Sequence, residues 1–427
     1  MGNDKKWSMF NVLFYSNSNY YIHNTLNGGM HEIDKSTFQL CKDIEENRIS
    51  LSSSIYEKLI QTLTSLHCIV GTTEDQESIN KLRYLKLLKT FQQERLSLVI
   101  APTLYCNFAC PYCYEKKLPN EQMDDVVIDM LINFIKQRES DFKQLEICWH
   151  GGEPLTAIGT IEKILHRIRD EINIKFCGHS IVTNGYLINE KVLECFEKYP
   201  LGYIQITIDG NETTHNQNRI SKNGKPTFTK IIENIDTLIQ RFPKTRIGVR
   251  MNIHKNNMDE FIPLYEILSK RWEKSKVSIY PAFVMNNASC KVPCFNSIEK
   301  TEFLYEIYKK IGKKYSEIDM KIKTGNCTAI YENSFVIDPK GNIFKCWADV
   351  GISKKRIGTL NEGITNYTLV EKYLLSSDKF TDKKCLKCKV FPICSGGCNK
   401  YRIDEEFNTD DICPLSVETI TKFLQVL

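Results

Sequence analysis

Six short apolar runs that alternate with amphipathic segments constrain the fold of this 427-residue chain more than any other feature. The runs occupy residues 96–103, 145–152, 179–185, 203–210, 246–253 and 276–283. The segments between them repeat apolar residues at helical spacing, as residues 122–138 do. Short strands joined by helices are typical of a buried parallel sheet. Six units are too few for a closed eight-stranded barrel, so the sequence predicts an α/β fold with a partial (β/α)6 TIM-like barrel.

The regions on either side of this barrel have other patterns, and they divide the chain into three predicted domains. Residues 1–93 hold two β-rich runs, two helical patterns near 34–46 and 53–66, and a short run "CIVG", which predict a winged-helix-like domain. The barrel is predicted over residues 94–325. Residues 326–427 are rich in Cys, Gly and Pro and have little apolar periodicity, so we expect metal centres to stabilise an irregular third domain.

Composition excludes several classes of protein. No apolar run approaches the roughly 20 residues that a membrane span needs, and the N-terminal segment lacks the apolar stretch of a signal peptide. The net charge of +5 is small for this length, and the lysines are scattered, which disfavours a nucleic-acid-binding surface. We therefore predict a cytoplasmic protein that binds neither a membrane nor nucleic acid.

The 17 cysteines are the unusual part of the composition. A reducing cytoplasm does not sustain a disulfide framework, and an odd number fits one poorly. Eight of the cysteines gather within residues 106–113 and 385–413. Clustering at ligand spacing indicates metal binding.

The first cluster has a CxxxCxxC spacing directly after the first predicted strand. Its members are Cys106, Cys110 and Cys113. A structural zinc site takes four ligands, whereas a [4Fe–4S] cluster held by three cysteines leaves one iron open. A zinc ion completed by a distant His or Cys, and three unrelated buried thiols, are the alternatives.

The segment "CNFACPYC" after "APT" resembles the cluster loop of the radical S-adenosylmethionine (SAM) enzymes. The resemblance implies that the open iron binds the amino and carboxylate groups of SAM, and that an electron from the cluster releases a 5′-deoxyadenosyl radical. It also implies contacts with SAM for Tyr112, Gly151, Gly152, Glu153, Asn184, Thr207, Asp209 and Arg219, with Tyr112 near the adenine and Glu153 of "GGEP" at the ammonium. Taken one by one, such strand-end residues are more often caps or turn residues. Arg250 is a lesser candidate.

Seven further cysteines have spacings that resemble a SPASM domain, the C-terminal extension of peptide-modifying radical SAM enzymes. The resemblance implies two auxiliary iron–sulfur clusters, an outer one on Cys385, Cys388, Cys394 and Cys413 and an inner one on Cys327, Cys346 and Cys398. The expected cofactors are then three [4Fe–4S] clusters and SAM. Seven thiolates leave the inner cluster one ligand short, so either Cys290 or Cys294 supplies it or an iron stays open for a substrate thiolate. Zinc is the alternative for the CxxC pairs.

The remaining cysteines fall in apolar strands or helices. We expect Cys41, Cys68, Cys148, Cys177 and Cys195 to be buried, inert thiols.

Function follows from the same resemblance. The N-terminal domain resembles the recognition element of peptide maturases, which binds the leader of a ribosomally made precursor peptide as an added strand. The chain is thus expected to be a radical SAM peptide maturase that takes hydrogen from a precursor residue and installs a crosslink, a cysteine thioether. A carbon–carbon crosslink or epimerisation would use the same parts. Flavodoxin or ferredoxin is the expected electron donor, and no catalytic side chain is identified beyond the cluster and SAM.

Three other interpretations compete with this one. Sulfatase-maturing enzymes resemble the chain, but they begin their barrel almost at the N-terminus and carry an aspartate where Trp347 stands in "KCWADVG". A metal-binding, redox-sensing regulator would bind DNA through the winged helix, yet "SIYEKLIQTLTSL" has a single lysine. Residues 8–93 could also be a structural extension alone.

Overall fold

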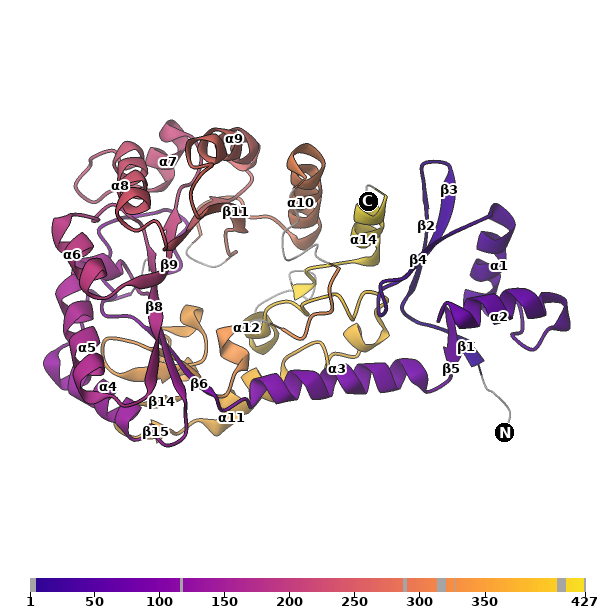
Figure 1. Ribbon diagram of the computed structural model, residues 1–427, viewed down its shortest axis with the longest axis horizontal. Coiled ribbons are helices and arrows are strands. Elements are labelled where there is room, and N and C mark those ends of the chain that lie inside the picture. The colour runs from indigo at the N-terminus through magenta and orange to yellow at the C-terminus, as the bar shows by residue number, and fades with distance from the viewer. Residues whose placement is uncertain are drawn as a thin grey trace. The chain divides into compact units, whose positions relative to one another are not determined.

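The computed structural model describes residues 5–115, 118–286, 290–312, 320–325, 327–404 and 412–425. The chain forms two compact units, whose elements Figure 1 labels. The sheet unit comprises Phe91–Phe295 and Thr328–Leu374, and the terminal unit comprises Met1–Thr90, Asn296–Cys327 and Leu375–Leu427.

The sheet unit is built on a ten-stranded sheet whose first six strands in chain order are parallel neighbours. They are β6 (Arg95–Ile100), β7 (Gln144–Trp149), β8 (Lys175–Thr183), β9 (Leu201–Thr207), β10 (Arg246–Ile253) and β11 (Val277–Phe283). Helices α4 (Asp125–Lys136), α5 (Ile158–Glu171), α6 (Glu190–Lys198), α7 (Glu212–Asn218), α8 (Phe228–Arg241) and α9 (Phe261–Arg271) connect them. The predicted α/β fold with a partial (β/α)6 barrel is confirmed.

Local sequence explains why these helices start and pack where they do. Asp124 caps α4, because its carboxylate accepts a hydrogen bond of 2.9 Å from the backbone N–H of Val127. In α8, residues Ile231, Ile235 and Leu238 repeat at helical spacing and are fully buried. Within the described ranges, no helix combines the length and the apolar character that crossing a membrane requires.

Four more strands extend the sheet beyond β6, and the sequence did not predict them. Strand β12 (Ser334–Ile337) pairs with β6 in parallel, and β13 (Asn342–Phe344), β14 (Gly358–Thr359) and β15 (Gly363–Ile364) follow in antiparallel order. Runs of two to four residues are too short to show a period. The segment after residue 325 is therefore partly ordered by strand pairing.

The N-terminal part of the terminal unit combines two small sheets with three helices. Strands β2 (Asn11–Ser16), β3 (Asn19–Asn24) and β4 (Met30–Ile33) form an antiparallel sheet, and β1 (Lys5–Trp7) pairs with β5 (Ile69–Gly71). Helices α1 (Lys35–Glu45) and α2 (Glu57–Ser65) lie where the sequence predicted helices, and α3 (Glu74–Thr90) follows β5. The assignment of this part as a winged-helix-like domain stays a prediction.

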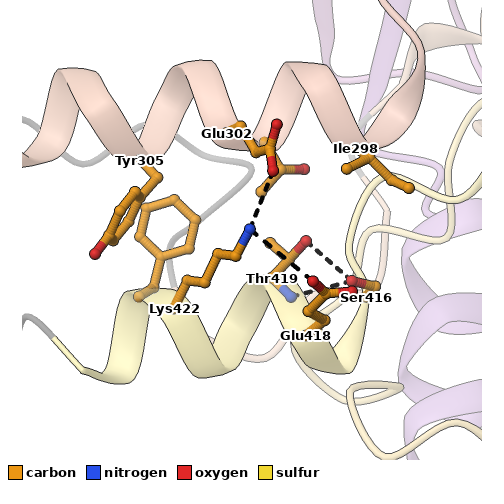
Figure 2. A pocket seen from close by; sticks show the side chains of 9 residues that line it. Ile298, Glu302, Tyr305, Ser416, Glu418, Thr419 and Lys422 are labelled. Atoms are coloured by element: carbon orange, nitrogen blue, oxygen red, sulfur yellow. Dashed lines mark hydrogen bonds and ion pairs between the residues drawn. The ribbon is translucent and has the colours of Figure 1, made fainter. Parts of the chain in front are cut away.

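The terminal unit also contains α10 (Ser297–Ile311), α12 (Asn399–Ile403) and α14 (Val417–Leu424). Helices α10 and α14 pack side by side, as Figure 2 shows. Lys422 Nζ lies 3.0 Å from Glu302 Oε1, and the rings of Tyr305 and Phe423 lie edge to face with centroids 5.4 Å apart. A pocket of about 120 Å³ lies between the two helices, and its polar side chains bond one another. It is a packing groove.

Buried apolar residues from both ends of the chain share the core of the terminal unit. Val12 and Phe14 of β2 lie in one cluster with Val390 and Ile393. A second cluster joins Phe10, Ile79 and Leu82 to Phe380 and Phe391. The unit thus contains residues of the first and the third predicted domains, packed on one another.

Candidate functional site

The three-cysteine loop, residues 106–113, follows β6 in the sheet unit. It carries Cys106, Cys110 and Cys113. The backbone N–H of Ala109 donates to the carbonyl of Ile220 at 2.8 Å, and that of Lys222 donates to the carbonyl of Asn107 at 2.9 Å. The loop is therefore fixed by backbone hydrogen bonds to the segment that follows α7.

The thiols of this loop are largely buried, with carboxylates near Cys106 and Cys113 and the guanidinium of Arg219 near Cys110 and Cys113. Burial raises the pKa of Cys106 to about 12, and the carboxylate of Glu153 adds to the rise. Burial likewise raises the pKa of Cys113 to about 12, with a further contribution from Glu115. Thiolates in such a place need a positively charged partner. Three thiols that convert to thiolates on binding fit an iron–sulfur cluster with one open iron.

Three predicted SAM contacts meet in one buried network beside the loop. The Tyr112 hydroxyl donates to the Asp209 carboxylate and accepts from Arg219 Nη1 at 3.0 Å and from Asn252 Nδ2 at 3.2 Å. Arg219 Nη1 lies 3.7 Å from Asp209 Oδ2. Sequence reasoning did not find Asn252, whose backbone N–H also donates to Asp209 at 3.0 Å.

One nitrogen atom of this network is a hydrogen-bond donor without an acceptor among the described residues. Among the described residues, Nε of Arg219 is a buried donor that meets no acceptor. A buried donor left without an acceptor costs about 1–3 kcal/mol. An anionic group such as a ligand carboxylate would satisfy it, so the chain fits the carboxylate of SAM here.

The glycines of "GGEP" are required by a close approach of two backbones. Gly151 has a φ of +113°, and a Cβ there would collide with the carbonyl oxygen of Thr103. A Cβ at Gly152 would collide with the carbonyl oxygen of Tyr105. The loop after β7 therefore packs directly on the segment that leads into the three-cysteine loop.

Glu153 is held by the protein itself. Its buried carboxylate accepts hydrogen bonds from the backbone N–H of Leu155 at 3.0 Å, from the Thr183 hydroxyl at 2.7 Å and from the backbone N–H of Asn184 at 2.7 Å. It thus ties the ends of β7 and β8 together. A contact between Glu153 and the ammonium of SAM stays a prediction.

The remaining predicted contacts also lie at strand ends. The Asn184 side chain donates to Asn107 Oδ1 at 2.8 Å and so contacts the three-cysteine loop. Thr207 is the last residue of β9 and is the parallel partner of Arg250 on β10. Arg250 donates to Asn252 at 2.9 Å. All eight predicted SAM contacts thus lie in the sheet unit.

A polar pair that the sequence did not predict lies beside the loop. Glu115 Oε1 is 3.7 Å from His150 Nδ1, and the His150 ring packs edge to face on Trp347 with centroids 4.5 Å apart. Burial and the nearby Glu153 raise the pKa of Glu115 to about 8, while burial and Arg250 lower the pKa of His150 to about 4. The only sequence signal that could have identified this pair is its position next to the motifs: Glu115 lies two residues after the third cysteine, and His150 directly precedes "GGEP".

The predicted outer set of cysteines lines one cavity in the terminal unit, which we call the four-cysteine cavity, although within the described ranges no three His, Cys, Asp or Glu side chains are arranged to hold a metal ion. The cavity has a volume of about 270 Å³ and is lined by Cys385, Cys388, Cys394 and Cys413. Burial raises the pKa of Cys394 to about 11. Lys379 and Arg402 also line the cavity, and burial lowers the pKa of Lys379 to about 8. Four thiols around one cavity are the donor set of a cysteine-ligated [4Fe–4S] cluster.

The structure does not bring the predicted inner set together in one unit. Cys327 and Cys398 belong to the terminal unit and are exposed, while Cys346 belongs to the sheet unit. Cys290 and Cys294 lie after β11 with their sulfur atoms 3.3 Å apart, and the N–H of Lys291 between them donates to the carbonyl of Pro111 in the three-cysteine loop at 3.3 Å. The inner cluster and its eighth ligand stay predictions.

The prediction of inert buried thiols is right for three cysteines and wrong for one. Cys41, Cys68 and Cys195 are buried, and Cys148 is half-buried. Cys177 is exposed. It lies where the register between β7 and β8 shifts, and such a bulge turns a side chain out of the regular alternation.

Comparisons with known proteins agree with this geometry. Residues 100–268 match the model of the Radical SAM superfamily. The radical SAM cyclopropyl synthase TigE of Paramaledivibacter caminithermalis is 22% identical over 91% of this chain and 88% of that protein. The cysteine-type anaerobic sulfatase-maturating enzyme of Clostridium perfringens is 26% identical over 73% of this chain and 90% of that protein.

Solved structures share the fold. Native anSMEcpe with bound AdoMet and Kp18Cys peptide aligns over 78% of this chain and 96% of that chain, with 20% identity and a TM-score of 0.61. Streptococcus suis SuiB bound to precursor peptide SuiA aligns over 96% of this chain and 100% of that chain, with 16% identity and a TM-score of 0.55. Residues 100–268 are therefore a radical SAM domain.

Proposed function

We propose that this radical SAM superfamily enzyme is a peptide maturase that installs a crosslink, a cysteine thioether, in a ribosomally made precursor peptide. The observation that carries the proposal is the convergence of Cys385, Cys388, Cys394 and Cys413 on one cavity in a chain that also has the three-cysteine loop. A single cluster is enough to cleave SAM, whereas a second one gives the enzyme an electron acceptor for an oxidative crosslink.

The three-cysteine loop is the proposed site of the first cluster. Cys106, Cys110 and Cys113 would hold a [4Fe–4S] cluster whose open iron binds SAM, and reductive cleavage of SAM with hydrogen abstraction is the chemistry that this pair supplies when bound. Arg219 offers its unused Nε donor to the SAM carboxylate. The close packing at Gly151 and Gly152 fixes the position of the loop that would face SAM.

The auxiliary sites complete the proposed set of three clusters. Cys385, Cys388, Cys394 and Cys413 would hold the outer auxiliary cluster, and Cys327, Cys346 and Cys398 the inner one. Their chemistry is to accept the electron that crosslinking releases. An external flavodoxin or ferredoxin would return the enzyme to its reduced state, and the reducing cytoplasm is the compartment in which these free thiols persist.

The leader of the precursor would bind the small sheet of the terminal unit. Among the described residues, β4 is an outer strand of the β2–β3–β4 sheet and is paired with β3 alone. An edge strand with unpaired backbone groups can accept an extended peptide, whose side chains then select the partner. The structure of SuiB bound to precursor peptide SuiA, which aligns over almost all of this chain, supports a precursor peptide as the substrate.

Sulfatase maturation is the second candidate. The match to the Clostridium perfringens sulfatase-maturating enzyme and the fold shared with anSMEcpe favour it. Trp347 stands where those enzymes have an aspartate next to a SPASM cysteine, and its ring packs on His150, which counts against it. The two relatives named above, both of which are enzymes, do not favour a redox-sensing regulator.

The experiment uses anaerobically reconstituted full-length protein, reductant, SAM and two peptides. One is a cysteine-bearing peptide encoded beside the gene of this chain, and the other is a sulfatase segment with the cysteine that is converted to formylglycine. We expect about twelve irons per chain, and loss of a hydrogen pair with loss of the free thiol in the first peptide by mass spectrometry. Aldehyde formation in the sulfatase peptide alone would establish the second candidate instead.

A further inference from the structure

Two cationic side chains line the four-cysteine cavity beside the thiols. Arg402 lies on α12, and Lys379 lies in the segment between α11 (Tyr367–Glu371) and the first cysteine of the cavity. Neither was singled out by sequence reasoning, because isolated basic residues are common on protein surfaces. Here both are close to fully buried, which requires a physical explanation.

Arg402 is fixed with one N–H directed at a cysteine sulfur. Its Nη2 donates to Cys385 Sγ at 3.4 Å and to the carbonyl of Gly396 at 2.8 Å, and its Nε donates to the same carbonyl at 3.2 Å. Nη1 pairs with the Asp382 carboxylate. The side chain is 11% exposed. The guanidinium is therefore pre-positioned against the sulfur rather than extended into solvent.

Lys379 is a second cation that lines the same cavity. Its Nζ donates to the carbonyl oxygens of Lys323 at 2.8 Å, Phe391 at 2.7 Å and Cys394 at 2.8 Å. These three bonds use all the ammonium protons on neutral acceptors, and the residue is 2% exposed. A buried ammonium is costly unless negative charge lies near it. The four cysteines supply that charge once they are thiolates.

We propose that Arg402 and Lys379 compensate the negative charge of the thiolates in the four-cysteine cavity and thereby raise the reduction potential of the iron–sulfur cluster held there. The inference rests on the proposed function, which puts a cluster on these cysteines. The potential of such a cluster depends on its net charge, on hydrogen bonds to its sulfur atoms and on its exposure to solvent. Fixed positive charge stabilises the reduced form, which carries one more electron.

The electron balance of crosslinking explains why a raised reduction potential would be useful. When a C–S bond replaces a C–H and an S–H bond, one hydrogen atom leaves with a fragment of SAM and one proton goes to solvent. One electron then remains, and a cluster held by the four cysteines would accept it, with no bond formed or broken there. A higher potential makes this last transfer more favourable.

The test compares Arg402→Gln with Lys384→Gln in full-length reconstituted protein. Both variants are made in a background in which the ligands proposed for the other two clusters are changed to alanine, so that those clusters do not contribute: Cys106, Cys110 and Cys113, and Cys327, Cys346 and Cys398. Lys384 lines the same cavity but is exposed, so that water and salt screen its charge. The midpoint potential is measured by redox titration followed by electron paramagnetic resonance, together with iron content.

We expect Arg402→Gln to keep its iron and to lower the equilibrium constant for reduction at least tenfold, which is about 59 mV for a one-electron couple. Lys384→Gln should leave the potential of the background unchanged. Equal potentials in the two variants, with full iron content, would overturn the proposal.

Two further variants keep the outcome readable. If Arg402→Gln loses iron, Arg402→Lys is measured in its place, because lysine keeps the charge but not the N–H directed at Cys385. We expect this variant to lower the potential by a smaller amount. An unchanged potential in Arg402→Lys would also overturn the proposal. Cys385→Ala in the same background should remove about four irons per chain. If it removes none, the cavity holds no cluster and the proposed function itself fails, which is a different result from an unchanged potential.

Discussion

The three-cysteine loop and the four-cysteine cavity present the same donor atom in different structural and electrostatic settings. The loop follows a central strand and is fixed by backbone hydrogen bonds to residues 220 and 222. The cavity is formed by a segment with little regular structure, in which Lys379 bonds three carbonyl oxygens and apolar residues pack on the N-terminal strands. Secondary structure therefore positions the first site, and tertiary contacts position the second.

Charge separates the two sites further. The thiols of the loop have the carboxylates of Glu115 and Glu153 and the guanidinium of Arg219 as charged neighbours, whereas two buried or largely buried cations, Lys379 and Arg402, line the cavity, with Asp382 paired to Arg402. Negative surroundings lower the reduction potential of a cluster, and positive surroundings raise it. Under the proposed function, the side chains that face each cysteine site suit the first site to electron donation and the second to electron acceptance.

The largest expected effect comes from removing the first site. Changing Cys113 to Ala should reduce SAM cleavage to the background, because a cluster with two thiolates on this loop is not held. The measurement is formation of 5′-deoxyadenosine by chromatography, with iron content falling by about four per chain. Cys177→Ala is the control, since Cys177 is exposed and lies outside both sites. Normal cleavage in the Cys113 variant would remove the loop from the mechanism.

Removing the second site should separate SAM cleavage from product formation. Cys394→Ala is expected to lose about four irons per chain, to keep cleaving SAM and to form no crosslinked peptide. Because metal binding stabilises an irregular segment, limited proteolysis between residues 379 and 413 should also become faster. A variant that still makes product would show that the cavity is not the electron acceptor.

The network behind the loop predicts a smaller effect, on stability. Asp209→Ala leaves Arg219 buried without its carboxylate partner, and breaking a buried pair in this way costs about 3–5 kcal/mol in the free energy of unfolding. Urea denaturation of the apoprotein measures it. Asp209→Asn keeps an acceptor for the Tyr112 hydroxyl and should cost less. Equal losses in the two variants would show that the charge of Asp209 matters more than its hydrogen bond with Tyr112.

The smallest effect concerns the sheet beneath the loop and depends on pH. His179 Nδ1 accepts from Trp149 Nε1 at 2.8 Å, and burial lowers the pKa of His179 to about 4 from its ordinary value of 6.5. The folded state thus binds fewer protons than the unfolded state between these values, so stability is full above 6.5 and falls as the pH drops toward 4. Between about pH 7.5 and pH 5, the contribution of His179 to the free energy of unfolding falls by about 2 kcal/mol.

Urea denaturation at the two pH values checks this prediction. His179→Gln removes the titrating group and should make the stability of the sheet unit less dependent on pH over this range. If wild-type protein is equally stable at both values, the imidazole is not held neutral by the core.

The sequence predicted the six parallel strands within a few residues, because strands buried on both faces are continuous apolar runs. It also predicted which cysteines meet in the cavity, although only through a resemblance. It missed Glu115 and His150, whose pairing at 3.7 Å joins two different strand-end loops. It also placed Cys177 in the interior, because a register shift between strands has no signal in the alternation of one strand.

The sequence alone specified the parallel strands, through apolar periodicity, and the cysteine clusters, through their spacing. Periodicity and spacing are properties of residues that are close together in the chain. Only the tertiary structure decided that Arg402 faces the sulfur of Cys385 and that Val12 shares a core with Val390. Such contacts join residues that no local period relates, and their energy comes from burial that exists only once the chain is folded. The charge around each cysteine site, and hence the task proposed for it, is a property of the fold.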